Sequence, residues 1–441
     1  MNKIIYWIIL LLGCQQFPVL NITGSSFKLY DLFSGILLWK KGLIISKDKL
    51  MRMIYLLFVV LPLLSLIISY IAIGYPEGFF RKYSSDSTIG SLKFNYYFFP
   101  LFQYIMMILC YTAIINVYYC EYIYNNIHKL ITGIVKIGSF IAIISLFNLF
   151  VTNIFHYVPS FISSIRTYSS RSQGFSIEPS SYVLYQSWIV LLCFYAKRLL
   201  KKRLWLILFS INILSLLLTL SSSLSIVVVT LIVTPFIVKA TKKIRLTILI
   251  SVIILLVGIF GLLVYTGYFD LAYKIMVAKL QNFFIPGTQT MDSGGFRSYT
   301  GRIGFKIGED HLFTGVGMGM SIYHMYEYEF KMGILSWGEK LVPGIQPMNC
   351  FSLVFSEMGI FALIVMVLIF AKILIILRKH SSENALCKIF FAGAIINVGT
   401  FFSLYPVYSL YLWAWMILGV GYCRYLDMRK NDSSNSSDHL V

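Results

Sequence analysis

Long apolar runs separated by short polar stretches make up most of the sequence. A helix needs about 20 mostly apolar residues to cross a bilayer, and roughly twelve runs approach this length. The pattern therefore predicts an all-α polytopic integral membrane protein, with residues 1–441 as a single membrane domain. Segments 28–45 and 180–196 fit the pattern least well. The predicted spans cover residues 4–22, 28–45, 53–74, 95–119, 130–155, 180–196, 204–220, 222–238, 246–266, 349–377, 386–404 and 406–423.

Two polar segments between the predicted spans are large enough to build a site, and both lie on the side opposite the N-terminus. The first is loop 156–179 and the second is the long loop 267–348. The long loop mixes glycine, aromatic residues and both charge signs, and its segment 296–313 is predicted to form a helix at the membrane interface. Loops held by a rigid helical scaffold often carry function. The polar tail 427–441 is predicted to be disordered.

Composition excludes the soluble classes of protein, because 58% of the residues are hydrophobic and only 12% are charged. The net charge of +19 would suggest a polyanion such as nucleic acid as the partner of a soluble protein. Sorting the 37 Lys and Arg residues by side changes that interpretation. With a cytoplasmic N-terminus, 24 fall on the cytoplasmic side, six in short outer loops and seven in loop 267–348. The charge therefore orients the chain, with both termini in the cytoplasm, and predicts membrane lipids but no nucleic acid as partners.

The first candidate site lies directly before the predicted span 180–196. Pro179 suits the first turn of a helix, which places Arg171 and Glu178 at the membrane surface. The forked, permanently charged guanidinium group matches phosphate oxygens, and a carboxylate beside it can act as a general base. The alternative is that both side chains only anchor the protein at the interface.

The second candidate site lies in loop 267–348, where three cations share a short stretch of predicted helix. Arg297, Arg302 and Lys306 would form a clamp for a diphosphate. The run from Gly315 to Gly319 lacks the spacing and the lysine of a phosphate-binding loop. We interpret its glycines as a turn that lets the backbone pass close to another segment.

The third candidate site begins the predicted span 349–377. Asn349 starts the segment and Glu357 follows inside the outer half of the membrane, where an ionisable group is a functional hypothesis by default. A carboxylate that only hydrogen-bonds a neighbouring helix is the alternative. His311 and His324 of the long loop are 13 residues apart in sequence without a third ligand, so no metal site is predicted, although a role as base stays open for either.

Together these motifs resemble the O-antigen polymerase and O-antigen ligase superfamily of bacterial inner-membrane proteins. The resemblance implies a helical fold of the C-type glycosyltransferase kind, a lipid-linked donor and chemistry in periplasmic loops. In the ligase branch a histidine usually precedes the asparagine, whereas Met348 stands here, so the resemblance favours a polymerase. The matching sequences are Arg171-x-x-Gly174-Phe175-x-x-Glu178-Pro179-Ser180, Gly301-Arg302, Gly315 to Gly319 and Asn349 to Gly359.

The resemblance also implies the substrates: an undecaprenyl-diphosphate-linked oligosaccharide donates to a hydroxyl of an incoming lipid-linked repeat unit. Arg171 and Arg302 are then expected to stabilise the departing diphosphate, with Arg297 in reserve. Glu178 is the first candidate for activating the acceptor, and Glu357 is the second. Sugar binding is expected at Tyr182, Tyr323 and Asn349. Neither a metal nor another cofactor is expected, and a chain-length regulator protein is an expected partner.

Two rival functions remain at this stage. A ligase would transfer finished O-antigen to lipid A-core. A flippase or another polysaccharide transporter would share the many spans and basic cytoplasmic loops, but such proteins usually carry charged or broken helices through the centre of the membrane.

Overall fold

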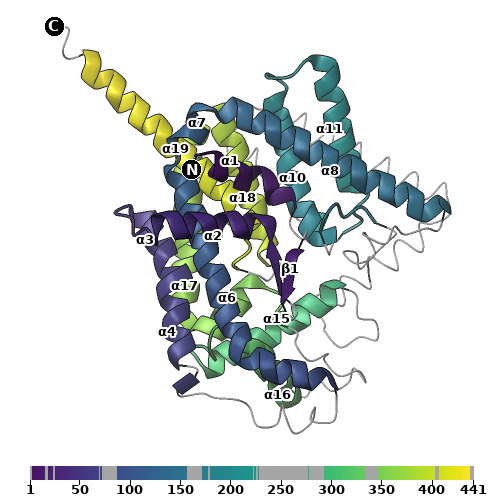
Figure 1. Ribbon diagram of the computed structural model, residues 1–441, viewed down its shortest axis with the longest axis vertical. Coiled ribbons are helices and arrows are strands. Elements are labelled where there is room, and N and C mark those ends of the chain that lie inside the picture. The colour runs from purple at the N-terminus through teal and green to yellow at the C-terminus, as the bar shows by residue number, and fades with distance from the viewer. Residues whose placement is uncertain are drawn as a thin grey trace.

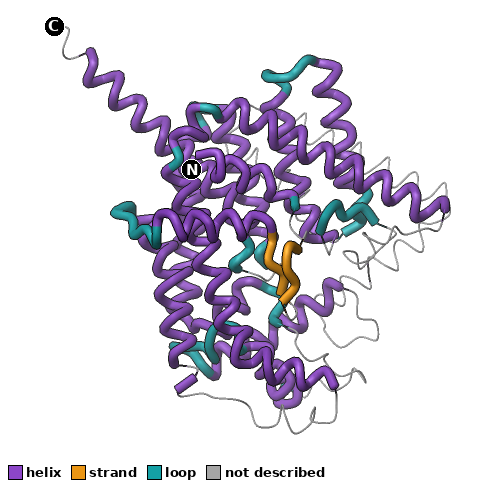
Figure 2. The backbone as a smooth tube through the Cα atoms, in the orientation of Figure 1, coloured by secondary structure: helices purple, strands orange, loops and turns teal. Residues whose placement is uncertain are grey.

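The computed structural model describes residues 2–14, 18–22, 25–68, 70–71, 87–155, 171–176, 179–221, 223–224, 227, 277, 293–332, 346–402 and 407–437. Helices dominate these ranges, and the strands found there form one antiparallel hairpin (Figure 2). The predicted helical class is therefore confirmed apart from this hairpin of β1 (Pro18–Ile22) and β2 (Ser25–Lys28). The helices are α1 (Asn2–Leu10), α2 (Leu29–Lys41), α3 (Lys49–Tyr55), α4 (Leu61–Ile68), α6 (Ser87–Tyr119), α7 (Glu121–Asn125), α8 (Ile127–Phe155), α10 (Pro179–Ala196), α11 (Lys202–Leu217), α15 (Ser293–Asp310), α16 (Ser321–Lys331), α17 (Cys350–Ser381), α18 (Ala385–Thr400) and α19 (Leu410–Ser437).

Four helical segments are long and apolar enough to cross a membrane, which suggests a multi-pass membrane protein. They are Lys49–Ile68, Phe99–Tyr119, Ile127–Thr152 and Cys350–Ser381. Each coincides with a span predicted from the sequence, at 53–74, 95–119, 130–155 and 349–377. The predicted spans 222–238 and 246–266 lie almost entirely outside the described residues.

The predicted span 4–22 is wrong, because helix α1 passes into a 3₁₀ turn that ends at Gly13 and strand β1 follows. A Cβ atom at Gly13 would lie 2.5 Å from the hydroxyl oxygen of Tyr185, so the chain needs a glycine at this close contact. Pro18 begins the strand, which is a position that proline tolerates. The apolar residues of β1 raise the hydropathy of the run as much as helical residues would, which explains the error.

The helix found in the predicted span 28–45 is also shorter than the prediction. Helix α2 ends at Lys41 and is followed by Gly42, whose φ of +66° ends the helical path. A helix of 13 residues rises about 20 Å, which is less than the roughly 30 Å of hydrocarbon in a bilayer. Segment 28–45 is therefore not a complete membrane-spanning helix.

The composition of residues 427–441 predicts a disordered tail, but most of this segment belongs to helix α19. It continues to Ser437 and projects from the body of the molecule (Figure 1). Two contacts, one to the end of α17 and one to the turn after it, hold its outer part in place. Asp427 Oδ1 lies 3.0 Å from His380 Nε2, and Lys430 Nζ lies 2.6 Å from Glu383 Oε2. Tertiary contacts of this kind are invisible to an argument from composition.

The core joins two groups of helices. Helices α8, α10 and α11 pack together, α18 connects them to α17 and α19, and α19 packs against α6. At this junction Trp188 of α10 stacks on Trp415 of α19 at 5.4 Å between ring centroids, and its Nε1 donates to Asn397 Oδ1 at 2.7 Å. Helix α10 is buried along almost its whole length. The predicted span 180–196, which has a weak hydropathy pattern, is therefore a central helix of the core. Helices α15 and α16 contact each other and pack against α17 (Figure 1).

Candidate functional site

Helix α15 is the helix predicted at 296–313, and it lies against the start of α17. Its glycines face that contact: a Cβ atom at Gly304 would lie 2.8 Å from Pro347, and one at Gly308 would lie 2.4 Å from Phe355. The backbone N–H of Met348 also donates to Thr300 Oγ1 at 3.2 Å. The second and third candidate motifs are therefore packed against each other.

Arg297 links α15 to the first motif. Its Nη2 donates a hydrogen bond of 2.8 Å to Ser180 Oγ, at the start of α10 and 117 residues away in the chain. Pro179 is the first residue of α10, as its place in the sequence predicted. All three candidate motifs thus meet around α15.

The three cations of α15 do not form the clamp that their spacing suggested. Arg297 and Arg302 are five residues apart, which places them about 140° apart around the helix. Arg302 is exposed, and among the described residues no ion pair involves it. Lys306 is partly exposed, but its Nζ lies 3.0 Å from Asp310 Oδ1 and 3.3 Å from Glu309 Oε2. These bonds raise the pKa of Lys306 and lower that of Asp310.

Arg171 begins a turn that a buried hydroxyl network fixes to the helices around it. Ser172 Oγ lies 2.8 Å from Ser145 Oγ of α8 and 2.9 Å from Ser215 Oγ of α11. Tyr182 of α10 joins the network, because its hydroxyl lies 2.8 Å from Ser215 Oγ. The hydroxyl network therefore fixes the turn that carries Arg171, which is partly exposed. The sequence analysis missed Ser145 and Ser215, although hydroxyl residues inside apolar helices are a usable signal for such contacts.

The residues expected to bind sugar are either buried or cap a helix. They are Tyr182, Tyr323 and Asn349. Tyr182 and Tyr323 are each only 1% exposed. The ring of Tyr182 also covers Gly174, whose φ is +53° and where a Cβ atom would lie 2.4 Å from that ring. Asn349 caps helix α17, since its Oδ1 accepts the backbone N–H groups of Phe351 and Ser352. The structure therefore gives each of these residues a role in packing or capping.

Glu357 is fully enclosed, with 1% of its surface exposed. Its Oε1 accepts from Ser321 Oγ at 2.7 Å and from Gln346 Nε2 at 3.4 Å, and its carboxylate also accepts the backbone N–H groups of Gly319 and Ser321. The carboxylate thus holds the glycine run at the start of α16. This arrangement matches the alternative in which Glu357 bonds to a neighbouring segment.

The glycine run forms the close backbone crossing that the sequence predicted. Val316 and Gly317 donate backbone hydrogen bonds of 2.8 and 3.0 Å to the carbonyls of Ser356 and Glu357. Gly315 has a φ of +64°, and a Cβ atom there would lie 2.3 Å from the backbone of Glu357. On the other side of the crossing, α17 breaks at Gly359, with a φ of +76°. A helix that looks continuous in sequence is therefore two helical segments.

His311 and His324 lie near each other, with 6.1 Å between ring centroids. Burial lowers the pKa of His324 to about 4, so this side chain is neutral at pH 7. Its Nδ1 is 3.9 Å from Glu327 Oε2, and with a neutral ring that contact is not an ion pair. Burial also lowers the pKa of His311.

A second buried carboxylate near α15 was missed by the sequence analysis. Glu329 of α16 is 6% exposed and accepts a hydrogen bond of 2.6 Å from the Tyr299 hydroxyl of α15. Burial and this bond raise the pKa of Tyr299. The pair fixes α16 to α15, 30 residues apart in sequence, so short-range patterns could not reveal it.

The first-choice base, Glu178, lies outside the described residues, as do residues 156–170 of its loop. Within the described ranges, no group of three or more His, Cys, Asp and Glu side chains could hold a metal ion. No protein-family model matches the chain, and no curated protein is similar to it.

Proposed function

We propose that the protein is an O-antigen polymerase-type glycosyltransferase, which joins undecaprenyl-diphosphate-linked repeat units at the periplasmic face of the bacterial inner membrane. Both termini would be cytoplasmic, and a chain-length regulator protein would be its partner. The observation that best supports the proposal is the meeting of three distant motifs around α15. Arg297 bonds Ser180 at 2.8 Å, and Thr300 bonds Met348 at 3.2 Å.

The proposed reaction needs a stabilised leaving group. The acceptor hydroxyl oxygen attacks the anomeric carbon of the donor, the bond from that carbon to the diphosphate oxygen breaks, and undecaprenyl diphosphate departs with the electron pair. Fixed cations stabilise the developing charge. Arg302 suits this role because it is exposed and carries no ion pair among the described residues. Arg171 suits it because its turn is tied to three helices.

The proposal assigns different duties to the remaining residues. Arg297 bonds Ser180 and so positions α15 against α10. Glu178 remains the group that takes the proton of the acceptor hydroxyl. Glu357 is reassigned from reserve base to positioning residue, because its carboxylate is enclosed by donors from the glycine run.

Two cations on α15, Arg302 and Lys306, provide the test. Purified full-length protein would be supplied with a lipid-linked repeat unit, and the polymer ladder would be followed over time. Arg302→Ala should slow polymerisation by about a hundredfold, as expected for losing roughly 3 kcal/mol of transition-state stabilisation. Lys306→Ala removes a partly exposed cation one turn away, which is already paired with Asp310 and Glu309, and should stay within about twofold. Equal rates for the two variants would refute the role of Arg302.

A transporter is the second candidate, because α17 is discontinuous at Gly359 and discontinuous membrane helices commonly form substrate sites in transporters. The same reconstituted protein distinguishes the two functions. A polymerase lengthens the glycan when all of the substrate is presented on one face of the membrane, whereas a flippase moves the unit across the bilayer and leaves its length unchanged. Transfer to lipid A-core instead of to a repeat unit would identify a ligase.

A further inference from the structure

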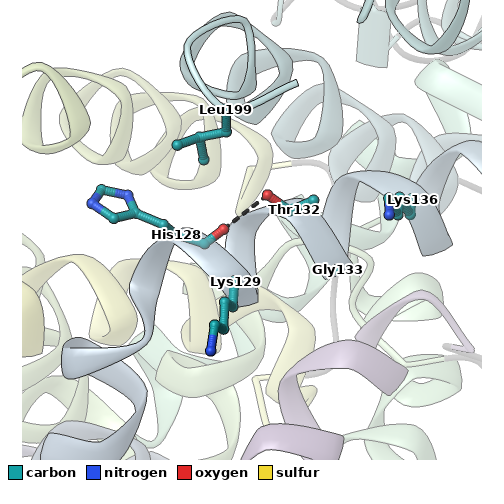
Figure 3. A pocket seen from close by; sticks show the side chains of 6 residues that line it. All are labelled: His128, Lys129, Thr132, Gly133, Lys136 and Leu199. Carbon is teal, nitrogen blue, oxygen red and sulfur yellow. Dashed lines mark hydrogen bonds between the residues drawn. The ribbon is translucent and has the colours of Figure 1, made fainter. Parts of the chain in front are cut away.

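A cavity of about 410 Å³ opens at the first turns of α8, away from the candidate site. Its position is at one end of the candidate span Ile127–Thr152. Figure 3 shows Leu199 above the helix, Lys129 below it, and Lys136 farther along the same helix. The lining residues are His128, Lys129, Thr132, Gly133, Lys136 and Leu199.

The charge around this cavity is strongly positive. Lys129 and Lys136 are exposed, and within the described part of the chain neither forms an ion pair. Leu199 belongs to the turn between α10 and α11, which carries a further run of exposed cations at 197, 198 and 201–203. His128 is held to one side, because its Nδ1 lies 3.2 Å from the Tyr195 hydroxyl and its ring stacks on Tyr195. An anion in the cavity would therefore meet two lysines.

An apolar surface continues from the cavity along the same face of α8. Phe140, Ile143 and Phe147 follow Lys136 at intervals of four, three and four residues, which keeps them on one side of the helix. They are 60%, 46% and 63% exposed. Ile143 and Phe147 also line an apolar groove of about 650 Å³ formed with Leu214 and Leu218 at the end of α11.

We propose that this face of α8 binds an anionic glycerophospholipid, with its phosphate between Lys129 and Lys136 and one acyl chain along Phe140 into the groove. The apolar surface of α8 beyond Lys136 favours this ligand over free phosphate, because free phosphate has no acyl chain to bind there. Basic pockets beside membrane helices are suited to such headgroups. The inference does not depend on the proposed function.

The test is binding of dioleoyl phosphatidylglycerol to the purified full-length protein in detergent, measured by native mass spectrometry. The Lys129→Gln/Lys136→Gln variant should lose about thirtyfold in affinity, because each of two surface cations contributes about fivefold. The Lys202→Gln/Arg203→Gln variant removes the same charge outside the cavity and should lose less than threefold. Both pairs are exposed, and thermal unfolding would verify that each variant remains folded.

Three outcomes would overturn the proposal. Equal losses in both double variants would mean that only general electrostatic attraction operates. Equal affinity of the unmodified protein for dioleoyl phosphatidylcholine would remove the need for an anionic headgroup. Displacement of the lipid by inorganic phosphate at millimolar concentration would identify a site for a free anion.

Discussion

The backbone crossing beside Glu357 can be tested with two glycines of nearly identical conformation. Gly359 has φ +76° and ψ −174°, and Gly42 has φ +66° and ψ −171°. Alanine at either position therefore carries the same backbone strain, about 1–3 kcal/mol. The surroundings differ: a Cβ atom at Gly359 would lie 2.4 Å from the Phe313 carbonyl oxygen, whereas nothing lies within 4 Å of one at Gly42.

The difference between the two variants isolates the crossing. The neighbouring backbone is fixed by a hydrogen bond of 2.8 Å from the Ile360 N–H to the Leu312 carbonyl, so relief of the clash requires backbone movement. Such overpacking costs about 1–3 kcal/mol. Gly359→Ala should therefore lower the free energy of unfolding by that amount more than Gly42→Ala does. Denaturant unfolding in detergent measures both values, and equal losses would refute the close crossing.

Three further predictions concern named side chains near the candidate site. Glu357→Gln should destabilise the protein by about 2 kcal/mol through weakened charged hydrogen bonds yet keep more than a tenth of the polymerisation rate per folded molecule; complete inactivity of folded protein would restore Glu357 as the base. Burial gives His324 a pKa of about 4, against 6.5 in the unfolded chain. The resulting contribution to the free energy of unfolding is fully present above pH 6.5. It falls by about 3 kcal/mol as the pH drops to 4. The His324→Leu variant should lose less over that range in thermal unfolding at stepped pH, and an unchanged loss would contradict the assignment. Arg171→Lys should polymerise at least about tenfold more slowly, since an ammonium group lacks the guanidinium fork, and a full rate would indicate a simple electrostatic anchor.

Local signals in the sequence predicted several elements well. Segment 296–313 was expected to be helical, and α15 covers Ser293–Asp310. Pro179 begins α10, as expected for a proline in a first helical turn. Gly315, Gly317 and Gly319 all have positive φ, in agreement with the predicted turn. In each case the residue type restricts the backbone directly, so no knowledge of distant neighbours is needed.

Features that depend on distant residues were not predictable in this way. The hairpin after Gly13 and the break at Gly359 both lie inside apolar runs, and hydropathy does not distinguish helix from strand or from a break. The contact of Arg297 with Ser180 joins positions 117 residues apart. The sequence identified Arg297 and Arg302 as candidate cations. Only the structure shows that the Arg297 side chain is bonded to Ser180, whereas that of Arg302 is exposed.

The position of the break at Gly359 along α17 bears on the comparison of the two proposed functions. The part of α17 after the break, residues 360–381, is about 33 Å long at 1.5 Å per residue, which is enough to cross roughly 30 Å of hydrocarbon without the preceding segment. With residues 360–381 as the span, Glu357 would lie at its end, beside α15, α16 and the glycine run, and would avoid the cost of an ionisable group at the bilayer centre. In a transporter, a broken helix places its polar residues near the midplane. A break at the end of a full-length span instead favours chemistry at the membrane surface, where Arg171 and Arg302 would meet a lipid-linked diphosphate.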